Sequence, residues 1–407
     1  MGSRSKLLVI LEQHFIQADD GTFYTDVQCD RTFWDRYLSA FDELNVFART
    51  RKARPGENLE KLLLSSRPEV HLFPMPDFRG VGGLVKNHGK IKAALQQALQ
   101  VSDAVIMRAP SPISLGVGNT VIKSGKPFAV EMAMNPITAY SRESMKSPLQ
   151  PFVQFFATTS TKRLCRKANG VSYVTEHVLQ QDFPCTAIRE GESDRYFTAH
   201  YSTINLTDDD YSLQEWPESA PDTISVAHVG KMMDLRKGHA IFIETLALLK
   251  QRGYQVNGTL IGDGPMRPQF EELAREKGVG DEIHFVGWRS GFRAVQQELQ
   301  KSMFFLFPTY SEGLPRSIIE AMASGLLCIG SSADGMVELL DKECISDRNS
   351  AEDYALMLAG YHSHWNKAIA TRDKQFDLSH KYNKRILDTY RTDFYKKLRK
   401  CGDKHAD

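Results

Sequence analysis

Short β-rich runs alternate with helical periods along the second half of this chain. The expected strands span residues 224–229, 255–261, 283–286 and 303–307, and the expected helices span residues 240–251, 269–277 and 292–301. Strands separated by helices of this length predict a parallel sheet with helices packed on its faces. We therefore expect the second half to form an α/β domain.

The first half repeats this pattern less regularly. Its expected strands span residues 7–11, 45–48, 70–73, 104–108, 128–132 and 170–174, with a helix over 85–99. Between the halves, residues 203–223 are polar and acidic and include Pro217 and Pro221, as in a linker. We predict a first domain over 1–202, a linker over 203–223, a second domain over 224–372 and a helical segment over 373–407.

Composition excludes several classes of protein. A formal net charge of +1 disfavours a generally basic nucleic-acid-binding protein. The six cysteines are widely spaced without a C-x-x-C pair, which indicates a reducing compartment and no structural zinc site. Because there is no signal peptide and no apolar run near the roughly 20 residues of a membrane span, we expect a cytoplasmic protein. Peripheral contact with the inner face of the membrane stays open.

Two carboxylates stand eight positions apart in residues 311–325. Glu312 follows the buried run 303–307 and Pro308, so it is expected in a loop at the carboxyl end of a strand. Pro315 suits the first turn of a helix and Gly325 its end, which places Glu320 within that helix. A helix N-terminus is a ready site for phosphate. Such a site beside carboxylates that accept sugar hydroxyls is what a nucleotide-sugar enzyme needs.

Two lysines belong to the loop after the strand 224–229. Gly230 permits a tight turn, and Lys231 and Lys237 offer charge to a diphosphate leaving group. Taken alone, they are more simply explained as solvated surface lysines. Two further strand-end turns begin at Gly262 and at Val286-Gly287. A plain turn is the better explanation of Gly262, whereas the backbone at Val286-Gly287 could pair with a nucleobase. Trp288 could equally pack over the core.

The order and spacing of these motifs, from Gly230 to the D-G-M-V-E run at 334–338, closely resemble glycosyltransferase family 4. The resemblance spans roughly residues 222 to 345. It implies a retaining, nucleotide-sugar-dependent enzyme of the GT-B fold, in which two Rossmann-like domains face each other across a cleft. It also implies a C-terminal helix that returns to the N-terminal domain.

The resemblance also implies roles for individual residues. Lys231, where the family usually has arginine, and Lys237 would bind the donor diphosphate and act in catalysis with Glu312, which would engage the transferred sugar. Glu320 would bind the nucleotide ribose, although an Arg316–Glu320 helix pair is the simpler alternative. The remaining donor-binding residues in this reading are Gly230, Gly262, Val286, Gly287, Gly313, Leu314 and Arg316.

The first domain would receive the acceptor, and its site is harder to identify. His14, Arg108 and Glu131 are the candidates, because they follow or end expected strands; a structural hydrogen bond is an equal alternative for His14 and Arg108. Two stretches, 152–167 and 395–400, combine aromatic and basic residues. Each could rest on anionic lipid headgroups or could be an ordinary helix with one packed face.

We predict a hexosyltransferase-type glycosyltransferase that moves a sugar from a nucleoside diphosphate sugar, with UDP and GDP both open, to an acceptor hydroxyl with retention of configuration. Polysaccharide or glycoconjugate biosynthesis is the expected setting, and the acceptor would be a glycan, a lipid-linked sugar or a small molecule. No cofactor, metal or nucleic acid is expected. The alternatives are a nucleotide-sugar epimerase or hydrolase of the same fold, and a non-catalytic sugar-nucleotide or glycan-binding protein.

Overall fold

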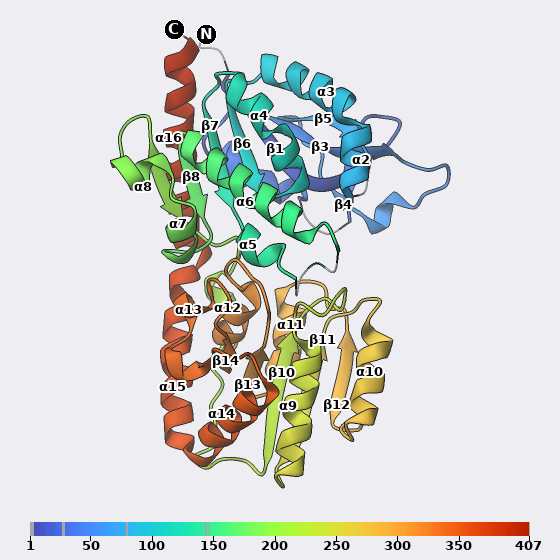
Figure 1. The fold of residues 1–407 in the computed structure, drawn as a ribbon, viewed down its shortest axis with the longest axis vertical. Helices are drawn as coiled ribbons and strands as arrows, with labels where there is room; N and C mark the ends of the chain where they lie inside the picture. Colours follow the sequence, from blue (N-terminus) through green and yellow to red (C-terminus); the bar gives the residue numbers. More distant parts are fainter. Residues whose placement is uncertain (1–3, 27–28, 79, 143–144, 146, 407) are drawn as a thin grey trace. The chain divides into compact units, whose positions relative to one another are not determined.

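The computed structural model describes residues 4–26, 29–78, 80–142, 145 and 147–406. The chain divides into two compact units (Figure 1). The first unit contains Met1–Pro136, Phe152–Tyr201 and Asp388–Asp407, and the second contains Ile137–Pro151 and Ser202–Leu387. The short segment before Phe152 therefore belongs with the second half of the chain, and the C-terminal residues belong with the first.

A predominantly parallel sheet forms the centre of the first unit. Its parallel strands lie in the order β5-β3-β1-β6-β7-β8-β9, and the short strands β2 and β4 add to it in antiparallel pairing. The bounds are β1 (Lys6–Gln17), β2 (Phe23–Thr25), β3 (Glu43–Lys52), β4 (Leu63–Leu64), β5 (Val70–Pro76), β6 (Ala104–Ala109), β7 (Phe128–Met132), β8 (Gly170–Tyr173) and β9 (Phe197–His200). This is the expected α/β architecture.

Helices cover this sheet because side chains on successive strand residues point to opposite faces. Val105 and Met107 of β6 and Val130 of β7 join one apolar core, which also contains residues of α3, α4 and α6. The α-helices of the unit are α1 (Asp35–Leu38), α2 (Gly80–Lys86), α3 (His88–Gln100), α4 (Pro112–Lys123), α6 (Gln150–Lys167), α7 (Val178–Asp182) and α8 (Thr186–Glu190); α5 (Pro136–Ala139) lies where the two units join in sequence. The predicted helix over 85–99 is thus two helices.

The second unit contains a six-stranded parallel sheet in the order β12-β11-β10-β13-β14-β15. The bounds are β10 (Thr223–Val229), β11 (Gln255–Ile261), β12 (Ile283–Gly287), β13 (Phe304–Phe307), β14 (Leu327–Ser331) and β15 (Ile345–Ser346). The α-helices are α9 (His239–Gln251), α10 (Arg267–Glu276), α11 (Phe292–Leu299), α12 (Arg316–Ala323), α13 (Met336–Leu339), α14 (Ala351–Ser363) and α15 (Trp365–Ser379). Each strand and helix predicted between residues 224 and 307 agrees with the structure to within two residues, whereas the helix expected from residue 373 already begins at Trp365.

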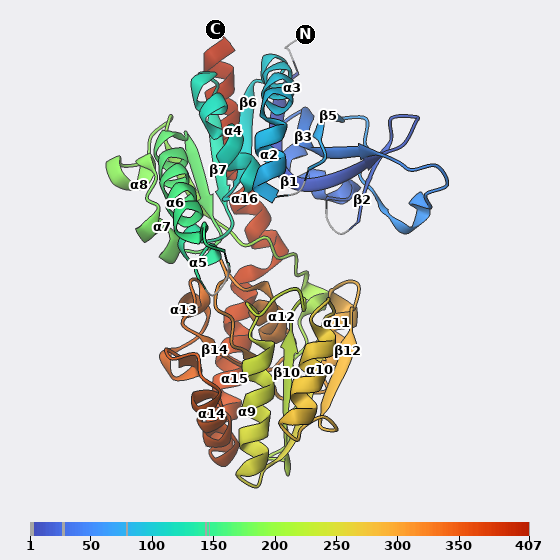
Figure 2. The same ribbon diagram turned by 45° about the vertical axis from the view of Figure 1, so that its right-hand side comes forward.

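The strand order of the second unit reverses between β10 and β13. From β10 the chain moves outward to β11 and β12, and α11 then returns it to the other side of β10, where β13 begins (Figures 1 and 2). In open α/β sheets, ligands bind outside the carboxyl ends of the strands at such a reversal. The ends of β10 and β13 are therefore the place to look for a site.

The C-terminal helix α16 (Lys384–Ala406) follows α15 after a short turn, so the helical segment predicted over 373–407 is interrupted at His380–Tyr382. From Asp388 onward, α16 belongs to the first unit, where Tyr395 packs against Tyr37 with ring centroids 4.9 Å apart. Among the described residues, no helix is both long enough and apolar enough to cross a bilayer.

Candidate active site

Two loops of the second unit leave the sheet side by side at the reversal point. Val226 and Ala227 of β10 pair with Phe304 and Phe305 of β13, so both strands end at the same edge. Residues 230–238 follow β10, and residues 308–315 follow β13. The first loop carries Lys231 and Lys237, and the second carries Glu312. The tertiary fold thus brings Lys237 and Glu312, which are 75 positions apart in the sequence, into contact.

Backbone contacts hold the two loops together. The N–H of Tyr310 donates to the carbonyl of Arg236 at 2.9 Å, and the Thr309 hydroxyl donates to the same oxygen at 3.2 Å. Gly238 has φ +76°, and a Cβ added there would overlap the carbonyl oxygen of Pro308. Glycine at position 238 therefore allows both the left-handed backbone and the close approach of the loops.

Lys237 and Glu312 form a direct ion pair between these loops. Their side chains are 24% and 20% exposed, and the Lys237 ammonium also lies 5.2 Å from the centroid of the Phe307 ring. Burial lowers the pKa of Lys237 to about 8, and repulsion from Arg236 adds to this effect. The charge of Asp234 partly opposes this lowering of the pKa, because an opposite charge favours the ammonium. The pair places a positive and a negative charge side by side, and both side chains remain partly accessible to a polar ligand.

A second layer of hydrogen bonds positions the Glu312 backbone. The Asp334 carboxylate accepts a bond from the Glu312 N–H at 3.3 Å and one from the Thr138 hydroxyl at 2.6 Å. The Ser311 hydroxyl in turn lies 3.0 Å from the Thr138 hydroxyl, and the Gly335 N–H donates to the Gly313 carbonyl at 2.9 Å. Asp334 lies in the D-G-M-V-E motif noted in the sequence, but no pattern linked Thr138 to this loop.

Glu320 lies inside α12, one turn from Arg316. Its carboxylate is 3.4 Å from the Arg316 guanidinium, and its side chain is 15% exposed. Burial raises the pKa of Glu320, which the charge of Arg316 partly offsets. Pro315 is the N-cap residue rather than a residue of the first turn, and its side chain has no acceptor for the helix N–H groups. Leu314 is buried just before it.

Three glycine turns stack at the neighbouring strand ends. The Gly230 N–H donates to the Ile261 carbonyl at 2.9 Å, and the Gly262 N–H donates to the Gly287 carbonyl at 3.0 Å. Gly262 has φ +137°, and an added Cβ would overlap the carbonyl oxygen of Gly230. These contacts place Gly230, Gly262, Val286 and Gly287 along one edge of the sheet.

Trp288 follows this edge and is exposed. It presents 53% of its surface, and the Lys231 ammonium lies 5.4 Å from its ring centroid. A packed position over the core, which the sequence left open, is therefore wrong. Lys231 is itself exposed, so a cation and an indole ring are both presented to solvent beside the glycine turns.

Two buried histidines lie beneath the lysine loop, and sequence reasoning missed them. The ring centroids of His228 and His239 are 4.5 Å apart. His239 Nε2–H donates to the Gly230 carbonyl at 3.2 Å, and His228 Nδ1–H donates to the Leu306 carbonyl at 2.9 Å. Burial lowers the pKa of His239 to about 4 and that of His228 well below its usual value. Both rings therefore support the loop in their neutral form.

Arg108 and Glu131, two of the acceptor-side candidates, face each other across β6 and β7. Their Nε and Oε2 atoms are 3.5 Å apart, and the two residues are partners in the strand register. Glu131 also accepts hydrogen bonds from the hydroxyls of Tyr37 at 3.0 Å, Tyr395 at 2.5 Å and Tyr201 at 3.4 Å. This network accounts for both residues within the first unit and ties α16 to the sheet.

His14, the third candidate, does not join this network. The strand expected to end at residue 11 continues to Gln17, so the expected place of His14 beyond the strand end is wrong. Its Nδ1 lies 2.6 Å from a carboxylate oxygen of Asp77, and its side chain is 44% exposed. The extension of β1 comes from pairing with β3, which resumes at His14 after a register shift.

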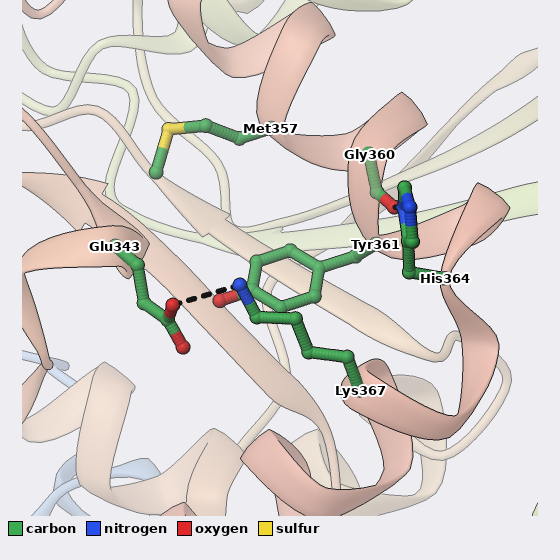
Figure 3. Close-up of a pocket in the computed structure, with 6 residues that line it drawn as sticks. All are labelled: Glu343, Met357, Gly360, Tyr361, His364 and Lys367. Atoms are coloured by element: carbon green, nitrogen blue, oxygen red, sulfur yellow. Dashed lines mark hydrogen bonds and ion pairs between the residues drawn. The ribbon is translucent and has the colours of Figure 1, made fainter.

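Other features of the described residues do not extend this site. No group of three or more His, Cys, Asp or Glu side chains among them is arranged to hold a metal ion. The six cysteines are buried, and none forms a disulfide within the part of the chain that the structure describes. A hollow of about 270 Å³ is lined by residues of the 3-10 helix η4 (Lys342–Cys344), α14 and α15, including Tyr361. Glu343 and Lys367 form an ion pair of 2.8 Å at this hollow (Figure 3). None of the described residues that line this hollow is a predicted donor-binding residue.

Residues 223–361 match the family model described as Glycosyl transferases group 1. Sucrose-phosphate synthase from Thermosynechococcus elongatus superposes with a TM-score of 0.66 at 16% identity over 95% of this chain and 97% of that one. WaaG, a glycosyltransferase involved in lipopolysaccharide biosynthesis, superposes with a TM-score of 0.63 at 15% identity over 95% and 98%.

The chain has a GT-B fold, and its residues 223–361 match a glycosyltransferase group 1 domain.

The matched segment contains every predicted donor-binding residue, from Gly230 to Glu320. Among curated proteins, Protein CapJ of Staphylococcus aureus is 24% identical over 320 residues, or 79% of this chain and 77% of the relative. The glycosyltransferase EpsF of Bacillus subtilis, described as putative, is 34% identical over 122 residues, or 30% of each chain. HepE of Anabaena, solved in complex with UDP-glucose, superposes with a TM-score of 0.62 at 14% identity over 95% of this chain and 98% of that one.

Proposed function

We propose that this protein transfers a hexose-like sugar from a nucleoside diphosphate sugar to an acceptor hydroxyl, with retention of anomeric configuration, in polysaccharide or glycoconjugate biosynthesis. The observation that carries the proposal is the Lys237–Glu312 pair at the reversal point of a Rossmann-like sheet. It combines a cation for phosphate with a carboxylate for sugar hydroxyls at the edge where such sheets bind ligands.

The donor would lie along the carboxyl edge of the second unit. Its diphosphate would take the charges of Lys231 and Lys237 and the N–H groups at the start of α12. The sugar would hydrogen-bond to Glu312, and the ribose hydroxyls to Glu320. The base would lie near Val286 and Gly287. Lys231 would act as a point charge, because lysine lacks the two-pronged geometry of arginine.

In this pose the reaction breaks the bond between the anomeric carbon and the diphosphate oxygen and forms a bond to the acceptor oxygen on the same face of the sugar. The acceptor hydroxyl gives its proton to the departing phosphate. Negative charge grows on the diphosphate as the bond breaks, so the lysines stabilise the transition state more than the bound donor. Lys237 would leave Glu312 for the phosphate, which frees the carboxylate for the sugar.

Two findings on other proteins support the choice of donor and setting. HepE, which shares the fold, was solved with UDP-glucose, and WaaG, which also shares it, is involved in lipopolysaccharide biosynthesis. We also propose that no divalent ion is needed, because two lysines supply the positive charge. Turnover that persists in excess EDTA is the expected result, and loss of turnover restored by Mg²⁺ or Mn²⁺ would contradict it.

Thermal unfolding in the presence of UDP-glucose, UDP-galactose, UDP-N-acetylglucosamine and GDP-mannose tests the proposal first. A donor at 100 times its Kd adds about 2.7 kcal/mol to the stability of the folded state, which raises Tm. The stabilising donor is then incubated with and without a panel of glycan and lipid-linked acceptors. A glycosylated product with a retained anomeric centre is expected. Donor converted without acceptor would instead indicate an epimerase or hydrolase, and binding without any conversion a sugar-nucleotide-binding protein.

A further inference from the structure

Helix α6 lies on the outside of the sheet of the first unit (Figures 1 and 2), and three of its phenylalanine side chains are exposed to solvent. Phe152, Phe155 and Phe156 are 69%, 70% and 48% exposed, and the rings of Phe152 and Phe156 stack with centroids 6.4 Å apart. The spacing i, i+3, i+4 places all three on one face. The buried face of the same helix is made of smaller residues, namely Ala157, Thr161, Leu164 and Cys165. The largest apolar side chains of α6 thus point away from the core.

Basic residues continue this face toward the C-terminal end of α6. Arg163, Arg166 and Lys167 are exposed and follow the phenylalanines at helical spacing. No Asp or Glu occurs between Gln150 and Lys167. Lys162 points elsewhere, since its ammonium lies 5.6 Å from the ring centroid of Phe183. We call the six residues Phe152, Phe155, Phe156, Arg163, Arg166 and Lys167 the aromatic–basic face.

The second aromatic and basic stretch of the sequence, residues 395–400, differs from α6 in its packing. Tyr395 and Leu398 are fully buried in the first unit. Lys397 is paired with Glu192 at 3.3 Å and Arg399 with Asp42 at 3.1 Å. In residues 395–400 the apolar groups therefore pack in the core and two of the charges form ion pairs within the protein. In α6 the phenylalanines and three of the basic residues are exposed to solvent instead.

We propose that the aromatic–basic face docks on the surface of an anionic phospholipid bilayer. The phenylalanines that are exposed in the free protein would leave water by inserting at the boundary between headgroups and acyl chains. Each basic residue would add electrostatic attraction to the anionic headgroups. The face runs roughly 22 Å from Phe152 to Lys167 at 1.5 Å per residue, so aromatic and basic groups can touch one surface together. The charge complementarity selects anionic lipid as the occupant. This inference does not rest on the proposed sugar transfer.

Co-sedimentation with vesicles tests the docking without donor or acceptor. Phosphatidylcholine vesicles with about one third phosphatidylglycerol are compared with pure phosphatidylcholine vesicles, at low and high salt. The full-length protein is expected to sediment with the anionic vesicles, and salt is expected to weaken this binding. Failure to sediment with anionic vesicles, or equal binding to both kinds, would overturn the proposal.

The apolar half of the face is tested by the triple variant Phe152→Ser, Phe155→Ser, Phe156→Ser. We expect its partition onto anionic vesicles to fall by at least about tenfold, because each buried phenylalanine favours binding. Leu356→Ser is the matched control, since Leu356 is 55% exposed on α14 of the second unit. The proposal would be refuted if the triple variant bound vesicles as well as the wild-type protein does. It would also be refuted if the wild-type protein did not bind vesicles but formed a dimer that the triple variant cannot form.

The basic half is tested by Arg163→Gln, Arg166→Gln, Lys167→Gln, which leaves the phenylalanines in place. This variant is expected to lose the preference for anionic over neutral vesicles and the salt dependence. Lys396→Gln, Lys400→Gln is its control, because both lysines are exposed on α16 outside the aromatic–basic face. An unchanged preference would overturn the proposal. Both triple variants alter exposed positions, and cooperative melting at the wild-type temperature verifies that they fold.

Discussion

Lys237→Met separates the role of the Lys237–Glu312 pair in transfer from its role in stability. Methionine keeps the length and the apolar contact with Phe307 but removes the charge. Glu312 then loses its partner while its side chain is only 20% exposed. Leaving such a group without its partner costs about 1–3 kcal/mol of stability. Removing one partner of a fully buried ion pair costs about 3–5 kcal/mol, and the cost is smaller here because water still reaches the carboxylate. We therefore expect a folded protein with a lowered Tm.

Transfer should suffer more than stability. If Lys237 binds the departing diphosphate, its loss removes a charge that acts mainly in the transition state. Loss of one such group typically slows turnover by about 100- to 1,000-fold, or roughly 3–4 kcal/mol. The assay is release of nucleoside diphosphate with the donor and acceptor found in the screen, together with urea unfolding of the same preparations.

A double variant distinguishes the two effects. Glu312→Gln removes the unpaired charge, so adding it to Lys237→Met should recover most of the lost stability while transfer stays slow. Lys250→Met is the matched control, because Lys250 forms an ion pair with Glu282 at the far end of α9 and should not affect transfer. Turnover within threefold of wild type in a folded Lys237→Met protein would refute the reasoning.

Three further predictions concern stability. Gly238→Ala should lower the free energy of unfolding in urea by about 3 kcal/mol or more, because the backbone would be strained and the new Cβ would overlap Pro308. Gly253→Ala, where φ is +89° and the added Cβ meets open space, should lower it by only about 1 kcal/mol. Equal costs would contradict the packing argument. Between pH 6.5 and 5, His239 should contribute a loss of about 1–2 kcal/mol, because the unfolded state takes up a proton that the folded state, with a pKa of about 4, does not. His239→Gln should show a correspondingly smaller loss of stability, and an unchanged dependence of stability on pH would exclude His239 as the cause. Glu131→Ala should lower the free energy of unfolding by about 3–5 kcal/mol, because Arg108 and three tyrosine hydroxyls lose their shared partner. Glu131→Gln should lower it by less, because the amide still accepts hydrogen bonds. Similar losses for the two variants would argue against the negative charge as the feature that organises this network.

Much of the second unit could be predicted from the sequence. The strands at 224–229 and 255–261 are short apolar runs between turn residues, and their pattern is local, so the sequence was sufficient to place them within a residue. Glycines 230, 262 and 287 likewise mark turns at strand ends. The first unit was harder to predict where pairing between distant segments extends a strand, as β3 extends β1 beyond His14.

The sequence also could not predict the partners of the site residues. Thr138 and Asp334 are 196 positions apart, and no periodicity indicates that they share a hydrogen bond behind Glu312. The two buried histidines were missed for a related reason. His239 follows Lys237-Gly238 at a helix start and His228 lies within a strand, so the only available signal was their proximity to the lysine loop.

By itself the sequence determined the fold class and the donor-side motifs, because alternating strands and helices, turn glycines and motif spacing are local properties of the chain. Only the tertiary structure decided which similar segments have different surroundings. Residues 152–167 and 395–400 have the same mixture of aromatic and basic side chains, yet the second buries Tyr395 and Leu398 while the first exposes its three phenylalanines. The composition of a helix determines how much free energy its apolar side chains can gain by burial. Which side of the helix packs on the core determines whether those side chains are buried within the fold or remain exposed for contact with another surface.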